Sequence, residues 1–465
     1  MKNKNEILYK ISIKRFKRRL WSKKKAKIRR SETQKQAQNI AKTKEKLLSD
    51  ESLLEKYLPA NLKYLISDNL SLFFIDKLKT VRSNIYGTYI VPENFSILDN
   101  PKESYAFIQE VTSCLIFRRN PIVTIDYNRC KNLELSTQVL LDIILKEAIE
   151  YFNIIKQINV KYAKVKQING INFNNDDIKK LLFSVGSPAI HSQNKREYND
   201  IIPYELCIHD REKHSDPIKI IEQKDIDTTR LVDYVVACLK RLNKKLTPDK
   251  LEDLCIVISE MLINAEEHSS TKYRFSIGYF HEKNENGKHY GVFRLTILNF
   301  GKTIYQKFRD PLCPNIEVVK KMKRLSDTYL AKRFFFEKTF EEESLWTLYS
   351  LQEGVTSIAP EEYSKRGNGS IQFIESFFNF KAEDELYQEV SKMTILSGNT
   401  SIVFDGKYKI FEKTIKGENF KYMTFNKSED IEDKPDNKYV KFVDNYFPGT
   451  LISTQILFND KTYES

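Results

Sequence analysis

The sequence predicts a mixed α/β fold of the α+β kind, built as a basic helical N-terminal arm, a small α/β domain and a C-terminal α/β sandwich. Two observations predict this class. Between residues 85 and 200, segments with apolar residues at helical spacing alternate with short apolar runs typical of buried strands. Further on, two helical segments precede two strand-like segments joined by a polar Asn/Gly turn. At 465 residues the chain has room for two or three domains.

The net positive charge lies at one end of the chain. Residues 1–30 hold 14 lysines or arginines and one acid, Glu6, for a net charge of +13, which equals the formal net charge of the whole chain. We take residues 1–50 as a basic arm. Its aromatic residues alternate with charges, which suits the phosphates of a nucleic acid or an anionic membrane surface. A solvated arm that contacts a protein partner is the alternative, and no helix-turn-helix, zinc-finger or RNP signature decides between them.

The rest of the composition is typical of a cytoplasmic protein. No apolar run approaches the roughly 20 residues that span a bilayer, so we expect no transmembrane segment. The N-terminus lacks the apolar core and cleavage site of a secretory signal. The six cysteines stand singly without CxxC spacing, which suits reduced thiols and gives no zinc site.

Residues 51–84 have helical patterns and predict a helical linker, and residues 85–200 predict the small α/β domain. Its strand-like segments alternate with helical ones in the order 86–92, 104–117, 121–129, 136–152, 161–170 and 174–186. Ser136 stands at the start of the longest helical segment, where we expect a helix cap.

This order, with VTIDY before CKNLELSTQVLLDII, resembles a STAS domain, a small α/β module found with anti-sigma-factor kinases. In that family a phosphorylatable serine falls at about the position of Ser136, but the surrounding Asp-Ser-Ser-Gly pattern is absent here. We therefore expect Ser136 to be a cap rather than a phosphate acceptor. Residues 201–224 are mixed and charged and predict a linker to the C-terminal domain, residues 225–465.

Residues 251–270, LEDLCIVISEMLINAEEHSS, predict an amphipathic helix with an unusual polar row. Glu260, Asn264 and His268 stand four residues apart, so they share one face. A carboxamide oxygen together with phosphate oxygens suits Mg²⁺. A carboxylate one turn earlier could orient or deprotonate a water for attack on phosphorus. The alternative is a surface helix whose polar face is solvated.

The stretch SEMLINAEEHS resembles the N box of the GHKL ATPases, the superfamily of gyrase and the histidine kinases, and is most similar to the anti-sigma-factor serine kinases and histidine kinases. The resemblance implies that Asn264 is the Mg²⁺ ligand, Glu260 the catalytic, base-like acid and His268 a phosphate-side contact. It implies ATP and Mg²⁺ as cofactors and a Bergerat-fold sandwich for residues 225–465.

The segment ILNFGKTI, residues 297–304, resembles the G1 box of the same family. There an acidic residue accepts a hydrogen bond from the adenine amino group, and a glycine lets the backbone pass close to the base. Asn299 and Gly301 occupy these two positions, and the side-chain oxygen of Asn299 can still accept that bond. Thr303 stands where the family has a second glycine.

Two later segments complete the resemblance. SKRGNGSIQF resembles the G2 box and places Arg366, Gly367 and Gly369 at the phosphates, where glycines that open a helix expose backbone N–H groups. The long segment between the G1 and G2 boxes fits a mobile lid that closes over ATP. FPGT before the final apolar strand places Thr450 near the adenine.

The sequence therefore predicts a cytoplasmic ATP-binding regulatory protein that hydrolyses Mg·ATP slowly or transfers a phosphoryl group to a partner serine or threonine. The alternative is a catalytically silent GHKL scaffold whose basic arm, residues 1–30, binds nucleic acid or membrane. We do not expect phosphorylation on histidine, because none of the histidines at 191, 209 and 214 lies on an amphipathic helix, and those at 281 and 289 have the pattern of surface residues. The partner and the oligomeric state, a dimer included, stay open.

Overall fold

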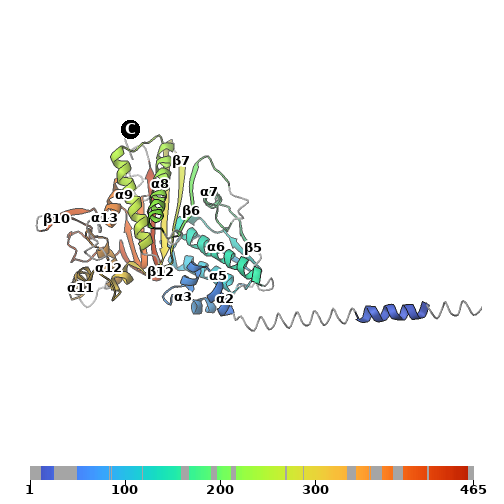
Figure 1. Cartoon of the computed structure of the whole chain (residues 1–465). Helices are drawn as coiled ribbons and strands as arrows, with labels where there is room; N and C mark the ends of the chain where they lie inside the picture. The colour runs from blue at the N-terminus through green and yellow to red at the C-terminus, as the bar shows by residue number, and fades with distance from the viewer. Residues whose placement is uncertain are drawn as a thin grey trace, which may run out of the picture. The chain divides into compact units, whose positions relative to one another are not determined.

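We describe the protein from a computed structural model that covers residues 12–25, 50–82, 84, 86–117, 119–158, 167–189, 196–210, 216–267, 270–285, 287–331, 342–355, 357, 369–380, 391–415 and 418–458. The chain divides into two compact units, residues 1–58 and 59–465. Helices and strands are mixed throughout the second unit, which confirms the α/β class (Figure 1).

The first unit contains two described helices, residues 12–25 and α2 (Asp50–Tyr57). The helix at 12–25 holds eight lysines or arginines and no acid, and its side chains Phe16, Leu20 and Trp21 are exposed. Among the described residues, no helix is both long enough and apolar enough to cross a bilayer.

The N-terminal part of the second unit contains a three-stranded parallel sheet in the order β1-β3-β5. Its strands are β1 (Thr88–Ile90), β3 (Ile122–Asp126) and β5 (Gln167–Ile171), and the helices α5 (Pro101–Ile116) and α6 (Leu135–Ile158) connect them. Neighbouring parallel strands need a long crossover connection, and a helix usually provides it. Two further strands of two residues each pair with one another in parallel. They are β2 (Asn94–Phe95), which follows β1 in the chain, and β4 (Asn132–Leu133), which follows β3. Residues 161–166 of the expected third strand lie outside the described residues.

Helix α7 (Asp176–Val185) begins and ends where the sequence predicts. Asn175 caps it by accepting the backbone N–H of Asp177 at 2.9 Å, and Gly186 ends it in the left-handed conformation at φ +69°.

Ser136, in contrast, is not a helix cap. It is the second residue of α6, it is fully buried, and its hydroxyl donates to Glu134 Oε1 at 2.5 Å. Glu134, the residue before α6, also accepts the Thr137 hydroxyl at 3.1 Å and the Ser96 hydroxyl at 2.6 Å. The carboxylate therefore binds the hydroxyls at the helix start, and the helix begins one residue earlier than the pattern predicts.

The segment 51–84, predicted to be a linker, contributes α3 (Ala60–Ser67) and α4 (Ile75–Thr80) to the second unit. The backbone N–H of Leu62 donates to Glu147 of α6 at 2.7 Å, and the Ser113 hydroxyl of α5 donates to the Leu78 carbonyl at 2.7 Å. Leu62 and Leu78 are buried, so burial of apolar side chains makes these helices part of the core.

A five-stranded sheet in the order β6-β7-β8-β12-β9 forms the centre of the unit, and all neighbours are antiparallel. The strands are β6 (Ile201–Asp210), β7 (Tyr273–Glu285), β8 (Lys288–Phe300), β12 (Val440–Phe458) and β9 (Lys392–Phe404). β6 lies in the segment 201–224, so the predicted linker instead forms an edge strand and the start of α8 (Pro217–Arg241).

One face of this sheet packs against the helices α8, α9 (Pro248–Glu267) and α13 (Gly369–Phe380), which share one apolar core with it. Helices α10 (Ile304–Arg309), α11 (Ile316–Ala331) and α12 (Glu342–Ser350) follow β8. α12 places Leu345 and the fully buried Trp346 in the core. This part of the segment predicted to be a lid is packed into the core, and opening it would expose these side chains to water.

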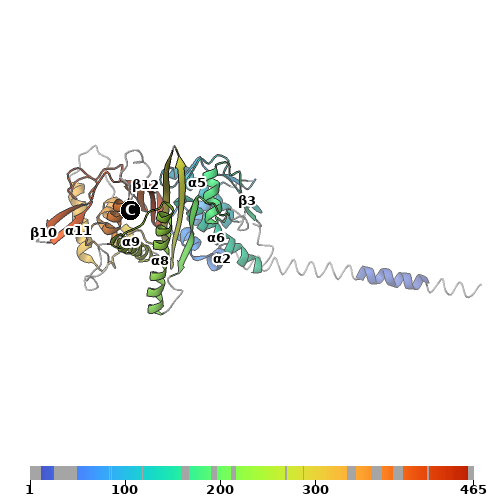
Figure 2. The ribbon, with the colours of Figure 1, turned by 90° about the horizontal axis from the view of Figure 1, so that it is seen from above.

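The opposite face of the sheet lies against the part that contains α5, α6 and α7, as Figure 2 shows from above. Side chains alternate between the two faces along each strand. On β8, Phe293, Leu295 and Ile297 enter the core with α8 and α9, whereas Arg294 and Thr296 face the other way. A hairpin of β10 (Phe411–Ile415) and β11 (Glu418–Tyr422) completes the described elements.

Candidate functional site

A row of polar residues crosses the whole sheet on its helix-covered side. Each member is the register partner of the next, one from each strand, in the order His209, Arg274, Asn299, Thr450 and Ser397. Register partners in an antiparallel sheet project from the same face. The row therefore places side chains from distant parts of the chain next to one another beneath the helices.

Asn299 and Thr450, both expected at the adenine, are direct neighbours in this row. The backbone N–H of Thr450 donates to Asn299 Oδ1 at 3.1 Å. This contact fixes the orientation of the amide, because the Nδ2 group cannot accept a hydrogen bond. Nδ2 is buried and has no hydrogen-bond partner among the described residues. A buried donor without a partner is unfavourable, and such groups in native proteins are commonly satisfied by water, an ion or a ligand.

Ser397 ties this pair to the start of α10. Its Oγ lies 3.0 Å from three groups: the Gly449 carbonyl, the Thr450 hydroxyl and the Ile304 N–H. The single Ser397 proton is used by the carbonyl, so the Thr450 hydroxyl and the Ile304 N–H donate to Ser397. Thr303, one residue earlier, is the N-cap of α10 in a complete capping box with Gln306. Thr303, which stands where the resembled family has a second glycine, thus has a structural role in this chain.

Gly449 lets β12 approach Asn299 closely. Its φ is +151°, and a Cβ at this position would collide with the Asn299 carbonyl oxygen. Gly301 follows β8 directly, is buried, and donates its N–H to the Pro448 carbonyl at 3.2 Å. Two glycines therefore flank the Asn299–Thr450 contact on the same side, Gly449 within β12 and Gly301 just after β8.

Arg274 connects the row to α9. Its Nη1 donates to the Leu262 carbonyl at 2.7 Å, and its Nη2 lies 3.1 Å from Asp227 Oδ2 on α8. Leu262 stands midway between Glu260 and Asn264 in the sequence. The helix turn that carries these two predicted site residues is therefore anchored to the strand position beside Asn299.

Asp227 also accepts from His209 Nδ1 at 2.5 Å, so one buried carboxylate holds both an imidazole and a guanidinium. Burial alone would lower the pKa of His209, but the bond to Asp227 raises it above its ordinary value. Burial alone would raise the pKa of Asp227, but His209, with Gln223 and Arg274, lowers it. The three groups form a charged cluster that joins β6, β7 and α8.

The remaining predicted site residues are placed as follows. Glu260 is half-buried on α9. Asn264 lies in α9, but its side chain lies outside what the structure describes, and His268, Arg366 and Gly367 lie outside the described residues. Gly369 is the first residue of α13, which packs against α9. Among the described residues, no group of three or more His, Cys, Asp or Glu could hold a metal ion.

Sequence reasoning missed Arg274, Asp227 and Ser397. Arg274 stands in YRFSIGYF, where a charged residue on an otherwise apolar strand was the available signal. His281, expected at the surface, is instead 5% exposed and lies 3.2 Å from Asp200. It projects from β7 toward the part of the protein that contains α7, where Asp177 lies 3.9 Å away, and burial lowers its pKa.

Comparison of the chain with protein-family models, with curated protein sequences and with solved structures finds no significant match.

Proposed function

We propose that the chain is an ATP-binding regulatory protein of the GHKL type, with the adenine at the Asn299–Thr450 pair and the phosphates at the C-terminal half of α9. The observation that supports this most strongly is the Asn299 amide, whose oxygen is held by Thr450 and whose buried Nδ2 has no partner among the described residues. The proposal rests equally on the family resemblance of the surrounding segments.

Adenine fits this amide in chemical terms. An asparagine amide presents a donor and an acceptor side by side, and paired hydrogen bonds of this kind recognise adenine elsewhere. Nδ2 is a donor for a ring nitrogen, and Oδ1 keeps a second lone pair for the exocyclic amine. Asn299 is fully buried, so the nucleotide reaches it only when neighbouring groups move aside. Binding is therefore coupled to a conformational change, which is what a regulatory protein needs.

The phosphate side of the proposed site uses residues of α9. Asn264 would hold Mg²⁺ through its amide oxygen, and the half-buried Glu260 would orient or deprotonate the attacking water or hydroxyl. The bond from Arg274 to Leu262 fixes the backbone between these two residues relative to Asn299. The chemistry would be slow hydrolysis of ATP or phosphoryl transfer to a serine or threonine of a protein partner.

The first test is titration calorimetry with Mg·ATP, together with a phosphate-release assay. We expect the wild type to bind, Asn264→Ala to lose Mg²⁺-dependent binding, and Glu260→Gln to bind but release no phosphate. Glu252→Gln is the matched control, because Glu252 lies on the same helix and is exposed. Absence of binding by the wild type at millimolar Mg·ATP would refute the proposal. ATP binding by both proteins, with phosphate release by the wild type no faster than by Glu260→Gln and no faster than the background, would instead favour a catalytically silent scaffold.

A second candidate function has its own observation. The helix at residues 12–25 is exposed, strongly basic and free of acids, with Phe16, Leu20 and Trp21 among its exposed side chains. We propose that this arm binds nucleic acid, because basic side chains attract phosphates and aromatic rings stack on bases. Binding of a single-stranded oligonucleotide should weaken steeply with salt and disappear when residues 1–30 are removed. Stronger binding to anionic vesicles than to the oligonucleotide would assign the arm to membranes instead.

A further inference from the structure

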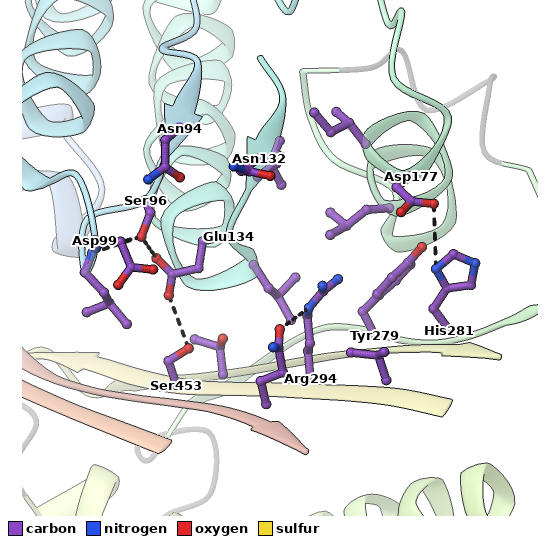
Figure 3. A pocket seen from close by; sticks show the side chains of 18 of the residues that line it. Asn94, Ser96, Asp99, Asn132, Glu134, Asp177, Tyr279, His281, Arg294 and Ser453 are labelled. Carbon is purple, nitrogen blue, oxygen red and sulfur yellow. Dashed lines mark hydrogen bonds and ion pairs between the residues drawn. The ribbon is translucent and has the colours of Figure 1, made fainter. Parts of the chain in front are cut away.

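A polar cavity of about 340 Å³ lies on the other face of the sheet, opposite the Asn299 row. Figure 3 shows it between the strands below and the ends of α6 and α7 above. The floor consists of side chains from β7, β8, β9 and β12, and the roof consists of residues around β2, β4 and α7. Those used below are Tyr279, His281, Lys283, Arg294, Thr296, Lys392, Ser453, Gln455, Asp99, Lys131, Glu134 and Asp177.

Arg294 projects from the centre of the floor into the cavity (Figure 3). Its Nε donates to Gln455 Oε1 at 2.8 Å, and its guanidinium lies 5.9 Å from the ring centre of Tyr279, its register partner on β7. Among the described residues no carboxylate lies within 4.0 Å of it. Burial lowers its pKa, and the more distant negative charges of Asp177 and Glu134 partly offset this. A guanidinium whose two terminal nitrogens have no hydrogen-bond partner among the described residues, in a partly desolvated site, is suited to a bidentate anion.

Two hydroxyls beside Arg294 have no hydrogen-bond partner among the described residues. They are the Tyr279 hydroxyl and the Thr296 hydroxyl, and both side chains are 1% exposed. Tyr279 and Thr296 lie on the same sheet face as Arg294, and all three residues line the cavity. Leaving buried hydroxyls unsatisfied is costly, and a bound ligand would remove this cost.

The other charges that face the cavity are already paired. Lys283 lies 3.1 Å from Asp177, and Lys392 lies 3.0 Å from Asp99. Lys131 pairs with Glu93 outside the cavity, and His281 lies 3.2 Å from Asp200 while burial lowers its pKa. Glu134 is the remaining anion, and it accepts hydroxyls, including that of Ser453 at 3.3 Å. Arg294 is the one cation of the described lining that lacks a carboxylate partner.

We propose that this cavity binds a small, hydroxyl-bearing anion, with its phosphate or carboxylate group on Arg294, Tyr279 and Thr296. A hydroxyl of the ligand would donate to Ser453, because each oxygen of the Glu134 carboxylate already accepts two hydroxyls. The volume lies near the lower end of the roughly 300–1,000 Å³ that ligand pockets span, which limits the ligand to metabolite size. The site is independent of the proposed nucleotide site, because the two lie on opposite faces of the sheet.

The test is titration calorimetry of the full chain with ribose 5-phosphate and with gluconate, and neutral ribose is the control ligand. We expect saturable binding of at least one of the two anions and none of ribose. The anion that binds more tightly identifies the group, phosphate or carboxylate, that the site accepts. If neither anion saturates the wild type at millimolar concentration, the proposal is overturned.

Variants separate the site from non-specific attraction. Arg294→Gln should weaken binding by about tenfold or more, because it removes the charge that pairs with the anion. Arg324→Gln, on the exposed side of α11, should bind like the wild type. Thr296→Val and Tyr279→Phe should each weaken binding several-fold yet raise the melting temperature of the unliganded protein, because each removes an unsatisfied buried hydroxyl. Unchanged affinity in Arg294→Gln and Thr296→Val together would contradict the proposal.

Discussion

The side-chain oxygen of Asn299 accepts the backbone N–H of Thr450 at 3.1 Å, although 151 positions separate the two residues in the chain. This contact joins the end of β8 to the middle of β12 and leaves the amide with only one possible orientation. The Nδ2 group, which has no partner among the described residues, and the second lone pair of Oδ1 are what the proposed nucleotide site offers to a base.

This fixed amide predicts selectivity for ATP over GTP. Guanine carries an acceptor oxygen where adenine carries its donor amine, so the two bases present opposite patterns. A free asparagine could rotate its amide to fit either base, but rotation here would place Nδ2 against the Thr450 N–H. We expect GTP to bind at least about tenfold more weakly than ATP, since a correct bidentate pair contributes about 1–3 kcal/mol. Competition of each nucleotide against a fluorescent ATP analogue measures this ratio, and equal affinities would place the base elsewhere.

The Asp227 cluster should be essential to stability. Asp227→Asn removes the carboxylate that pairs with both Arg274 and His209, and it leaves a buried guanidinium without its counter-charge. We expect a loss of about 3–5 kcal/mol in the free energy of unfolding, measured by urea denaturation. Asp225→Asn, two residues earlier on α8 and exposed, should change stability little. A loss of similar size in both variants would show that the pairing is not the cause.

Gly449 should tolerate no side chain. In Gly449→Ala the new methyl group would collide with the Asn299 carbonyl oxygen, so the β8–β12 contact must open. Gly354→Ala is the matched control, because Gly354 also has a positive φ, of +75°, but a Cβ added there would meet nothing within 4 Å. We expect Gly449→Ala to lose about 1–3 kcal/mol more than Gly354→Ala in urea denaturation. It should also weaken ATP binding, and a Gly449→Ala variant as stable as Gly354→Ala would refute the close approach.

Asp142 should make stability depend on pH. It is buried in α6 and its Oδ1 accepts from the Ser187 hydroxyl at 2.6 Å and from Gln138 Nε2 at 2.8 Å. Burial raises the pKa of Asp142 from 3.8 to about 7, and these hydrogen bonds offset part of the effect. Because the folded pKa lies above the unfolded one, the contribution of this group to stability is full below about pH 4 and is lost as the pH rises toward 7.

The contribution of Asp142 to the free energy of unfolding changes by about 4 kcal/mol at most over this pH range, since each unit of pKa corresponds to about 1.4 kcal/mol. In urea denaturation across this range, the stability of the wild type relative to Asp142→Asn should fall as the pH rises. Asp327 is exposed on α11, so the stability of Asp327→Asn should change with pH in the same way as that of the wild type. A difference between wild type and Asp142→Asn that does not vary with pH would contradict the raised pKa.

Elements with strong local signals could be predicted from the sequence. Asn175 and Gly186 mark the two ends of α7, and the polar turn after β7 marks the β7–β8 hairpin, because capping and turn chemistry act between near neighbours in the chain. The strand β6 could not be recognised. Its residues are mostly half-exposed at the sheet edge, so its composition resembles a linker, and only pairing with β7 makes it a strand.

By itself the sequence determined the α/β class, the basic arm, and the residue types that suggest a nucleotide site, because periodicity, charge and turn residues are local properties. Only the tertiary structure decided that β12 inserts between β8 and β9, so that Asn299, Thr450 and Ser397 become neighbours and Arg274 reaches Leu262 of α9. It also decided that Arg294 faces a cavity rather than solvent. Strand order and register follow from backbone hydrogen bonds and core packing between segments more than a hundred residues apart, and such contacts leave no signature in any one stretch of sequence.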